Sequence, residues 1–318
     1  MGKIKSLFTG RLTASMLSLW SILIVLFIIT GLVDHYFFTI PSIGVTFQLA
    51  VPLGLLAAGQ TICMLTGGID LSIAMIATGA AFIVSIKSPS GLGMAIFYAT
   101  LYCILIGAIN GLAVGLLGMN PLIMTLGMNA VLIGVFTVGI TTFLKGSSTM
   151  PDIIIKLSTA SIIDPISWPL VLWILIGGFV LYLLKQTGLG RLIYAVGDNA
   201  KAARLAGIRV WKVQLTAYIL CALLGGLAGL MIGGQSGAVA MSLADSLVLP
   251  SVAAVVIGGT SIMGGMGGYT GSIMGTLILT VLSYLLATLN SSEAVKQMIY
   301  GSIVLALAWT YSKLTEKS

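Results

Sequence analysis

Long apolar stretches, separated by short polar or glycine-rich breaks, occupy nearly the whole chain. A helix needs about 20 mostly apolar residues to cross a membrane. The first such stretch, Met16 to Val33, follows three basic residues and has no small-residue cleavage site after it. We therefore expect an uncleaved first helix rather than a signal peptide. Further single helices are expected at about Ile43 to Thr66, Leu71 to Ile86, Pro165 to Leu184, within Val213 to Ala244, and at about Ala294 to Tyr311.

Two uncharged stretches are too long for one crossing each. The stretch from Ser88 to Leu144 contains a turn signal at Gly118-Met119-Asn120-Pro121, and such a signal separates two helices. The stretch from Ser246 to Ser292 breaks in the same way within Gly264-Gly265-Met266-Gly267-Gly268. The pattern predicts an all-α polytopic membrane protein with about ten transmembrane helices, which form a single domain over residues 1–318.

The composition excludes several other classes of protein. Hydrophobic residues make up 58% of the 318 residues and charged residues only 7%, whereas soluble domains carry roughly 25% charged residues. A disordered chain, a disulfide scaffold and a nucleic-acid partner are excluded on the same grounds. Cys63, Cys103 and Cys221 lie inside apolar runs and are interpreted as small buried hydrophobes. The one histidine, His35, follows the first apolar run, and we expect an interfacial residue and no metal site.

The charges indicate how the chain is oriented in the bilayer. Ten crossings place both termini on the same side, and basic residues concentrate in the cytoplasmic segments of membrane proteins. With both termini cytoplasmic, most of the fifteen lysines and arginines fall in inner segments. The inner residues are Lys3, Lys5, Arg11, Lys185, Arg191, Lys201, Arg204, Arg209, Lys212, Lys313 and Lys317, and the outer ones are Lys87, Lys145, Lys156 and Lys296.

Glycine recurs at four-residue spacing along three of the expected helices. The chain has 40 glycines, and runs such as Gly107/Gly111/Gly115, Gly225/Gly229/Gly233 and Gly271/Gly275 let helices approach closely. We expect these faces to pack within the chain; a dimer face is the alternative.

Pro52 is followed by Gly67-Gly68, and Pro250 by Gly264-Gly265, at nearly the same distance. The pattern is consistent with a duplicated four-helix bundle with broken helices, as in many transporters.

The inner segment at about residues 186–212 is the longest expected cytosolic loop. Its middle predicts a short helix from Ala200 to Ala206, with Asp198 or Asn199 as the N-cap and Gly207 as the terminator. Such a helix lies along the membrane surface and presents its basic residues to lipid headgroups or to a partner.

Four motifs of this sequence, in order, resemble the sugar-type permeases of ABC importers. This family transports ribose, xylose, arabinose and galactose and belongs to the branched-chain amino-acid permease superfamily. The resemblance spans roughly residues 45–310 and departs from the family at Asp198 and Ala200, where Gly and Pro are more usual. The matching stretches are Gly67-Gly68-Ile69-Asp70-Leu71-Ser72; Asn120-Pro121 with Thr125-Leu126-Gly127; Thr187, Gly190-Arg191, Tyr194-Ala195, Gly197, Asn199, Ala202-Ala203 and Gly207-Ile208; and Ala253 to Ser261 with Gly264-Gly265 and Gly267.

The resemblance implies a permease subunit of the bacterial inner membrane that binds no cofactor itself. ATP would be hydrolysed by separate ABC ATPase subunits, a periplasmic solute-binding protein would deliver the solute, and a second or homologous permease would complete the pathway in the lipid bilayer. The chain contains no G-x-x-x-x-G-K-[ST] sequence for nucleotide binding. The residues implied in ATPase coupling are Gly190, Arg191, Gly197, Asp198, Asn199, Lys201, Ala202, Ala203, Arg204 and Gly207.

Asp70 is the acidic residue nearest to an apolar segment. A charge at membrane depth is costly and is a functional hypothesis by default. We expect it to cap the helix that starts at Leu71; a gating or coupling role is the alternative. The residues assigned to structure and gating are Gly67, Gly68, Asp70, Gly258, Gly259, Gly264 and Gly265.

Neutral polar residues within the spans are the candidates for a solute pathway. Gln60, Asn110, Thr125 and Asn129 suit an uncharged polyhydroxy solute such as a monosaccharide, although bonds between helices would explain them equally well. Nucleosides or branched-chain amino acids are alternative solutes, and an ion-coupled secondary carrier is the alternative mechanism. We expect no enzyme, because neither a nucleophile with its base nor a carboxylate pair is visible.

Overall fold

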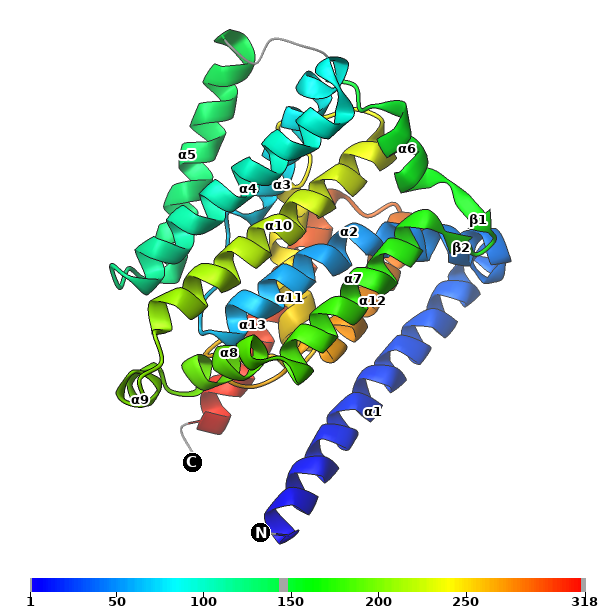
Figure 1. Cartoon of the computed structure of the whole chain (residues 1–318). Helices are drawn as coiled ribbons and strands as arrows, with labels where there is room; N and C mark the ends of the chain where they lie inside the picture. The colour runs from blue at the N-terminus through cyan, green and yellow to red at the C-terminus, as the bar shows by residue number, and fades with distance from the viewer. Residues whose placement is uncertain (1, 143–147, 316–318) are drawn as a thin grey trace.

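A computed structural model of the chain describes residues 2–142 and 148–315, so Lys145 and Lys317 lie outside the described residues. Each of the ten expected stretches contains a helix (Figure 1). The ten helices are α1 (Gly2–Val33), α2 (Ile40–Leu65), α3 (Ile73–Lys87), α4 (Leu92–Gly115), α5 (Pro121–Thr142), α7 (Trp168–Gln186), α10 (Val210–Ser236), α11 (Val248–Ile257), α12 (Tyr269–Thr288) and α13 (Glu293–Thr315).

Seven helices in the described part of the chain are long and apolar enough to span a membrane: α2, α3, α4, α5, α7, α10 and α12. Within α1, the apolar stretch Leu17–Val33 is shorter, and so is the one that ends with α11. The chain is therefore a polytopic, mostly helical membrane protein, and the count of ten crossings stays a prediction.

Several short elements connect these helices. They are the 3₁₀ turns η1 (His35–Phe38), η2 (Ser88–Ser90) and η3 (Asp245–Leu247), the helices α6 (Asp152–Thr159), α8 (Gly188–Asp198) and α9 (Ala200–Leu205), and the antiparallel strands β1 (Ser161–Ile163) and β2 (Ile166–Ser167). The β1–β2 hairpin departs from a purely helical chain. Helix α7 begins at Trp168 rather than at Pro165, because β2 occupies the preceding residues and the Ser167 hydroxyl accepts from the Leu170 N–H at 3.4 Å.

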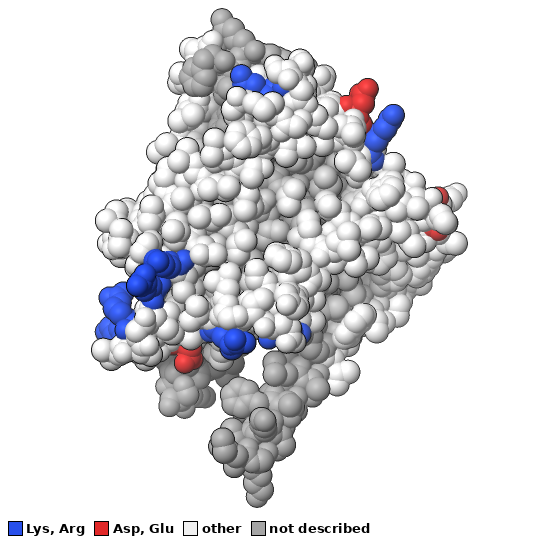
Figure 2. Space-filling model, viewed as in Figure 1, with Lys and Arg blue, Asp and Glu red and all other residues white. Residues whose placement is uncertain are grey.

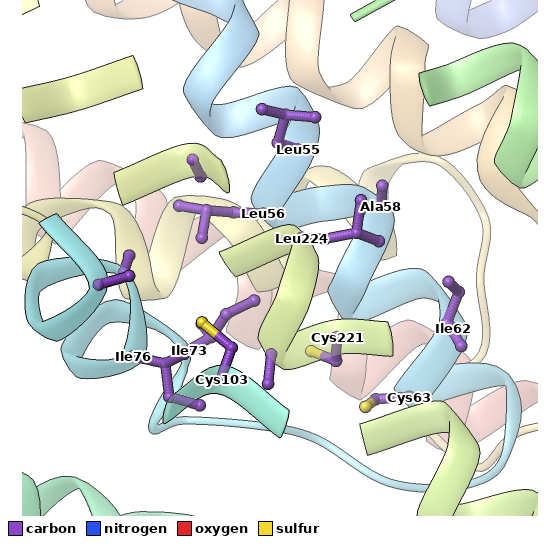
Figure 3. Close-up of a cluster of buried hydrophobic side chains, with 14 of the residues drawn as sticks. Leu55, Leu56, Ala58, Ile62, Cys63, Ile73, Ile76, Cys103, Cys221 and Leu224 are labelled. Atoms are coloured by element: carbon purple, nitrogen blue, oxygen red, sulfur yellow. The ribbon is translucent and has the colours of Figure 1, made fainter. Parts of the chain in front are cut away.

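Helices α2 and α10 form the centre of the bundle. Helix α10 packs against α2, α3 and α4, whereas α2 packs against α10, α11 and α12. The two run antiparallel: the side chain of Gln235 contacts Gln48 near one end, and Cys63 contacts Ala217 near the other. Figure 3 shows the apolar cluster where they meet α3, with Leu56, Ile73 and Cys221 among its residues.

Glycines bring these helices within backbone contact. A Cβ atom at Gly229 of α10 would overlap the Ala77 carbonyl of α3, and one at Gly111 of α4 would lie 2.6 Å from the Cα of Leu215. A Cβ at Gly275 would overlap the Ala254 carbonyl. These glycine faces therefore pack inside the chain, as predicted, and the three cysteines are buried and unpaired, also as predicted.

The middle of α2 is fixed by two aromatic residues. The Trp173 ring occupies the place of a side chain at Gly54. Its Nε1–H donates to the Tyr269 hydroxyl at 2.7 Å, which in turn donates to the Gly54 carbonyl at 3.0 Å. Helices α7 and α12 thereby hold α2 next to Pro52, its internal proline.

One end of the bundle carries most of the exposed basic residues. The start of α1 and the end of α13 lie at the same end of the molecule as α8 and α9 (Figure 1). Figure 2 shows lysines and arginines gathered over that end, where Arg191, Lys201, Arg204, Arg209 and Lys212 are exposed. We call it the basic end, and the opposite end, with α6 and the hairpin, the hairpin end.

Candidate functional site: helices α8 and α9, the glycine junction and the outer cavity

Helix α8 lies against the basic end of the bundle. Thr187 caps it by accepting from the Gly190 N–H at 3.2 Å. A Cβ at Gly190 would overlap the last carbonyls of α7, so the turn between α7 and α8 admits only glycine there. Ile193 and Val196 are buried while Arg191 is exposed. The sequence indicated one short helix in this loop and missed α8, whose amphipathic face was visible in its spacing.

Helix α9 follows α8 and projects from the corner of the basic end (Figure 1). The Asn199 carboxamide oxygen accepts from the N–H groups of Lys201 and Ala202 at 3.0 and 2.9 Å, so Asn199 rather than Asp198 is the N-cap. Gly207, at φ +83°, ends the helix in a left-handed turn. Ala203 is buried, whereas Leu205 is 90% exposed. The predicted cap, helix and terminator are confirmed, and the outer face of α9 is exposed within the described part of the chain.

Replacing Asn199 with alanine is expected to weaken α9 by about 0.5–2 kcal/mol, because two backbone N–H groups lose their acceptor. If α9 has the coupling role that the resemblance implies, solute-stimulated ATP hydrolysis by the complete assembly should fall several-fold. Asn199→Asp keeps the acceptor and is the matched control, which should retain most of the stimulation. Equal stimulation in wild type and Asn199→Ala would show that the order of α9 has no part in coupling.

The end of α2, the end of α8 and the loop before α12 meet through four glycines, which we call the glycine junction: Gly67, Gly197, Gly264 and Gly265. A Cβ at Gly197 would overlap the Leu65 carbonyl oxygen, and that same oxygen accepts from the Gly265 N–H at 3.1 Å. A Cβ at Gly264 would lie 2.8 Å from the Gly67 nitrogen. Three segments far apart in sequence are thus joined backbone to backbone.

Other residues pack around the glycine junction. The Tyr194 hydroxyl of α8 donates to the Gly267 carbonyl at 3.0 Å, and burial raises its pKa, so it remains a donor at neutral pH. Gly68 leaves room for the Tyr218 hydroxyl, which would lie 2.6 Å from a Cβ there. Gly258 packs against Gly271 of α12, and Gly259 takes a left-handed turn at φ +81°. The predicted gating glycines therefore lie at the basic ends of α2 and α11.

Asp70 lies in the turn between α2 and α3 and is fully buried. One carboxylate oxygen accepts from the Ser72 N–H at 2.9 Å and from its hydroxyl at 2.6 Å, and the Asn110 amide donates to that hydroxyl at 2.9 Å. The other carboxylate oxygen has no hydrogen-bond partner. Helix α3 begins at Ile73, two residues later than predicted. Asp70 therefore fixes the approach to α3 rather than its first turn.

Three of the four predicted pathway residues hold this same turn. The Gln60 amide donates to the Asp70 carbonyl at 2.6 Å and accepts from the Asp70 N–H at 3.2 Å. The Asn110 amide reaches the turn through Ser72, and the Thr125 hydroxyl accepts from the Leu71 N–H at 3.1 Å. Asn129 is half-buried on α5 and takes no part in these bonds. The sequence identified these polar residues, and the structure brings three of them together at one turn.

A separate cavity of about 350 Å³, which we call the outer cavity, lies in the half of the bundle nearer the hairpin end. It lies between the N-terminal half of α2, the end of α10, the segment leading into α11, and the facing ends of α12 and α13. None of the four predicted pathway residues lines it. Sequence reasoning missed this cavity because its polar residues are scattered over five different elements. They are Thr46, Gln235, Ser246, Thr280, Ser283, Tyr284, Glu293 and Tyr300.

A family profile described as "Branched-chain amino acid transport system / permease component" matches residues 42–308. The chain belongs to this family. The match covers the bundle from α2 to α13, including α8, α9 and the glycine junction. The chain is therefore a transport permease subunit and not an enzyme.

Curated relatives agree with this placement. The permease protein LsrC of the autoinducer 2 import system from Yersinia pseudotuberculosis (serotype O:1b, strain IP 31758) is 31% identical over 292 residues, which are 90% of this chain and 81% of the relative. LsrC from Yersinia pestis (strain Pestoides F) has the same identity and coverage, and LsrC from the serotype O:3 strain YPIII of Y. pseudotuberculosis is 30% identical. No solved structure matches the chain.

Proposed function

We propose that the chain is the membrane-spanning subunit of an ATP-driven importer of the bacterial inner membrane, which takes up a monosaccharide or related polyol. A periplasmic binding protein delivers the solute, and a second copy or a homologous permease completes the pathway. The observation that carries the proposal is the free, capped α9 beside the glycine junction, in a chain whose relatives are named as import permeases. This subunit binds no cofactor, and ATP is hydrolysed by its partner.

In this proposal α9 is the element that docks on the ATPase. Its outer face carries Lys201, Arg204 and the almost fully exposed Leu205, and such an apolar and basic projection suits a cleft on a partner. The connection to the bundle runs through α8, because Gly197 at its end contacts Leu65 at the end of α2. Motion of the ATPase subunits would reach the transmembrane core by this route.

We further propose that both termini are cytoplasmic and that the bundle is an inverted duplication. Exchanging α2 with α10, α3 with α11 and α4 with α12 preserves the main packing partners, and antiparallel central helices are what inversion requires. The Pro52 and Pro250 motifs are not equivalent under this exchange, since they lie on α2 and α11. The repeat would then lie in the arrangement of the helices and not in the proline motifs, and the chain would cross the membrane ten times.

The test is uptake of labelled pentoses and hexoses into proteoliposomes. The chain reconstituted with its ATPase, partner permease and binding protein should accumulate one of these sugars only when ATP is present. The chain alone should accumulate nothing under a proton or sodium gradient.

One feature favours an ion-coupled carrier instead. Asp70 is buried and has no cationic partner within the described residues. Gradient-driven uptake by the lone chain would establish that alternative.

Replacement of residues 197–207 with a flexible linker is expected to abolish ATP-driven uptake. The helices of the bundle form their own core, so the protein should still fold and give an unchanged elution profile in detergent. A control replacement with the same kind of linker belongs in the shorter, exposed segment 159–166 at the hairpin end. Uptake that survives the 197–207 replacement would refute the coupling role of α9.

A further inference from the structure

Pro52 leaves a gap in the hydrogen bonding of α2 that another helix fills. Proline has no N–H, so the carbonyl four residues earlier lacks its helical donor. That carbonyl belongs to Gln48, and it accepts from the side-chain amide of Gln235 on α10 at 3.1 Å. The bond joins the two central helices at the point where α2 is interrupted.

A second glutamine–carbonyl bond lies beside Pro250, the third residue of α11, where the missing N–H interrupts no bond of that helix. The carbonyl four residues before this proline belongs to Ser246, and it accepts from the side-chain amide of Gln297 on α13 at 2.8 Å. Both prolines are thus accompanied by a glutamine from a neighbouring helix. A glutamine amide can donate to one group while its oxygen accepts from another, so each side chain can bind a carbonyl and a further hydroxyl together.

The outer cavity lies between these two bonds. Pro52, Pro250, Gln235 and Ser246 all line it, whereas Gln297 does not. Its volume of about 350 Å³ lies within the roughly 300–1,000 Å³ of small-molecule sites.

The rest of the cavity wall offers hydroxyl groups, aromatic rings and one charge. The Tyr284 hydroxyl donates to Asp34 at 2.8 Å, and the Glu293 carboxylate lies 3.3 Å from the Lys296 ammonium. The one carboxylate on the wall is thus compensated by a neighbouring cation. Such a wall suits a ligand with several hydroxyl groups and no net charge, because each ligand hydroxyl can both donate and accept.

We propose that the outer cavity binds the solute, an uncharged polyol, and that Gln235 is the residue that senses it. A solute hydroxyl would donate to the Gln235 oxygen or take its place at the Gln48 carbonyl. The second of these replaces the bond that holds α2 to α10 beside Pro52, so occupancy is linked to the contact between the two central helices. This inference rests on the proposed function, because it places the solute of the importer in a particular cavity.

Accessibility of one cysteine tests the site in the chain alone. The native cysteines Cys63, Cys103 and Cys221 are buried, so Ser283→Cys, on the cavity wall, should be the main site modified by a membrane-impermeant methanethiosulfonate added at the hairpin end. One member of a panel of uncharged pentoses and hexoses should slow this modification at least five-fold, and leucine should not. Modification of Thr288→Cys, one turn further along α12 and outside the cavity, should be unaffected. Protection by leucine alone, or by nothing in the panel, would overturn the proposal.

Transport by the assembled importer tests the role of Gln235. Gln235→Ala should raise the half-saturating solute concentration at least ten-fold. Gln297→Ala removes the other glutamine–carbonyl bond but lies outside the cavity, so its half-saturating concentration should stay within two-fold of wild type. Equal effects of the two variants would show that both glutamines only stabilise helices. If wild type shows no ATP-driven uptake, the proposed function fails, while protection of Ser283→Cys still decides whether the cavity binds a polyol.

Discussion

Replacing Gly197 with alanine is expected to eliminate ATP-driven uptake. The added Cβ would overlap the Leu65 carbonyl oxygen, and no rotation of a side chain can relieve a clash with backbone. The end of α8 must then move away from α2, which removes the contact through which we expect α9 to act on the bundle. The hydrogen bond from Gly265 to the same oxygen should be lost as well.

Two measurements separate this effect from a failure to fold. The thermal midpoint of the purified protein should fall by only a few degrees, since most of the core lies away from the junction, whereas solute-stimulated ATP hydrolysis should drop to the basal rate. Gly178→Ala in α7 is the matched control, because nothing lies within 4 Å of the added Cβ. A Gly197→Ala importer with normal uptake would show that the junction does not transmit motion.

Asp70→Ala is expected to destabilise the protein strongly. It would leave the N–H and hydroxyl of Ser72 without their acceptor in a fully buried turn. An unsatisfied buried polar group costs about 1–3 kcal/mol, and two are created here. Thermal unfolding followed by circular dichroism should show a midpoint lowered by several degrees, with loss of uptake.

Asp70→Asn distinguishes the two roles considered for this carboxylate. Asparagine keeps an acceptor for Ser72 and removes a charge that lacks a cationic partner, so its stability should equal or exceed that of wild type. If Asp70 serves only to fix the turn, Asp70→Asn should also transport normally. A stable variant that cannot transport would assign a gating or coupling role to the charge.

The features predicted from the sequence are those encoded locally. The helix at Ala200, its Asn199 cap and its Gly207 terminator depend on neighbouring residues, and apolar length alone located the stretches that contain the long helices. The identity of the polar residues in the spans was also visible, but their partners were not. Gln60 and Thr125 bind the same turn from α2 and α5, and sequence spacing does not specify such contacts.

The glycine junction and the outer cavity depend on long-range packing. Gly197 is separated from Leu65 by more than 130 residues, and nothing near either position indicates that they touch. The bond between Gln235 and Gln48 likewise requires the antiparallel contact of α2 and α10. A proline within an apolar run does signal an unpaired carbonyl, and a glutamine in another apolar run is a residue that can donate to it.

Helix α2 has one further property that follows from how it is held. Its 26 residues extend about 39 Å at 1.5 Å per residue, and the Trp173 and Tyr269 contacts at Gly54 grip it near its midpoint. Because α2 is held near its midpoint, we expect a tilt to move its two ends in opposite directions. A tilt that widens the outer cavity would therefore press the other end of α2 toward the glycine junction, so this one helix would keep both ends of the bundle from opening together.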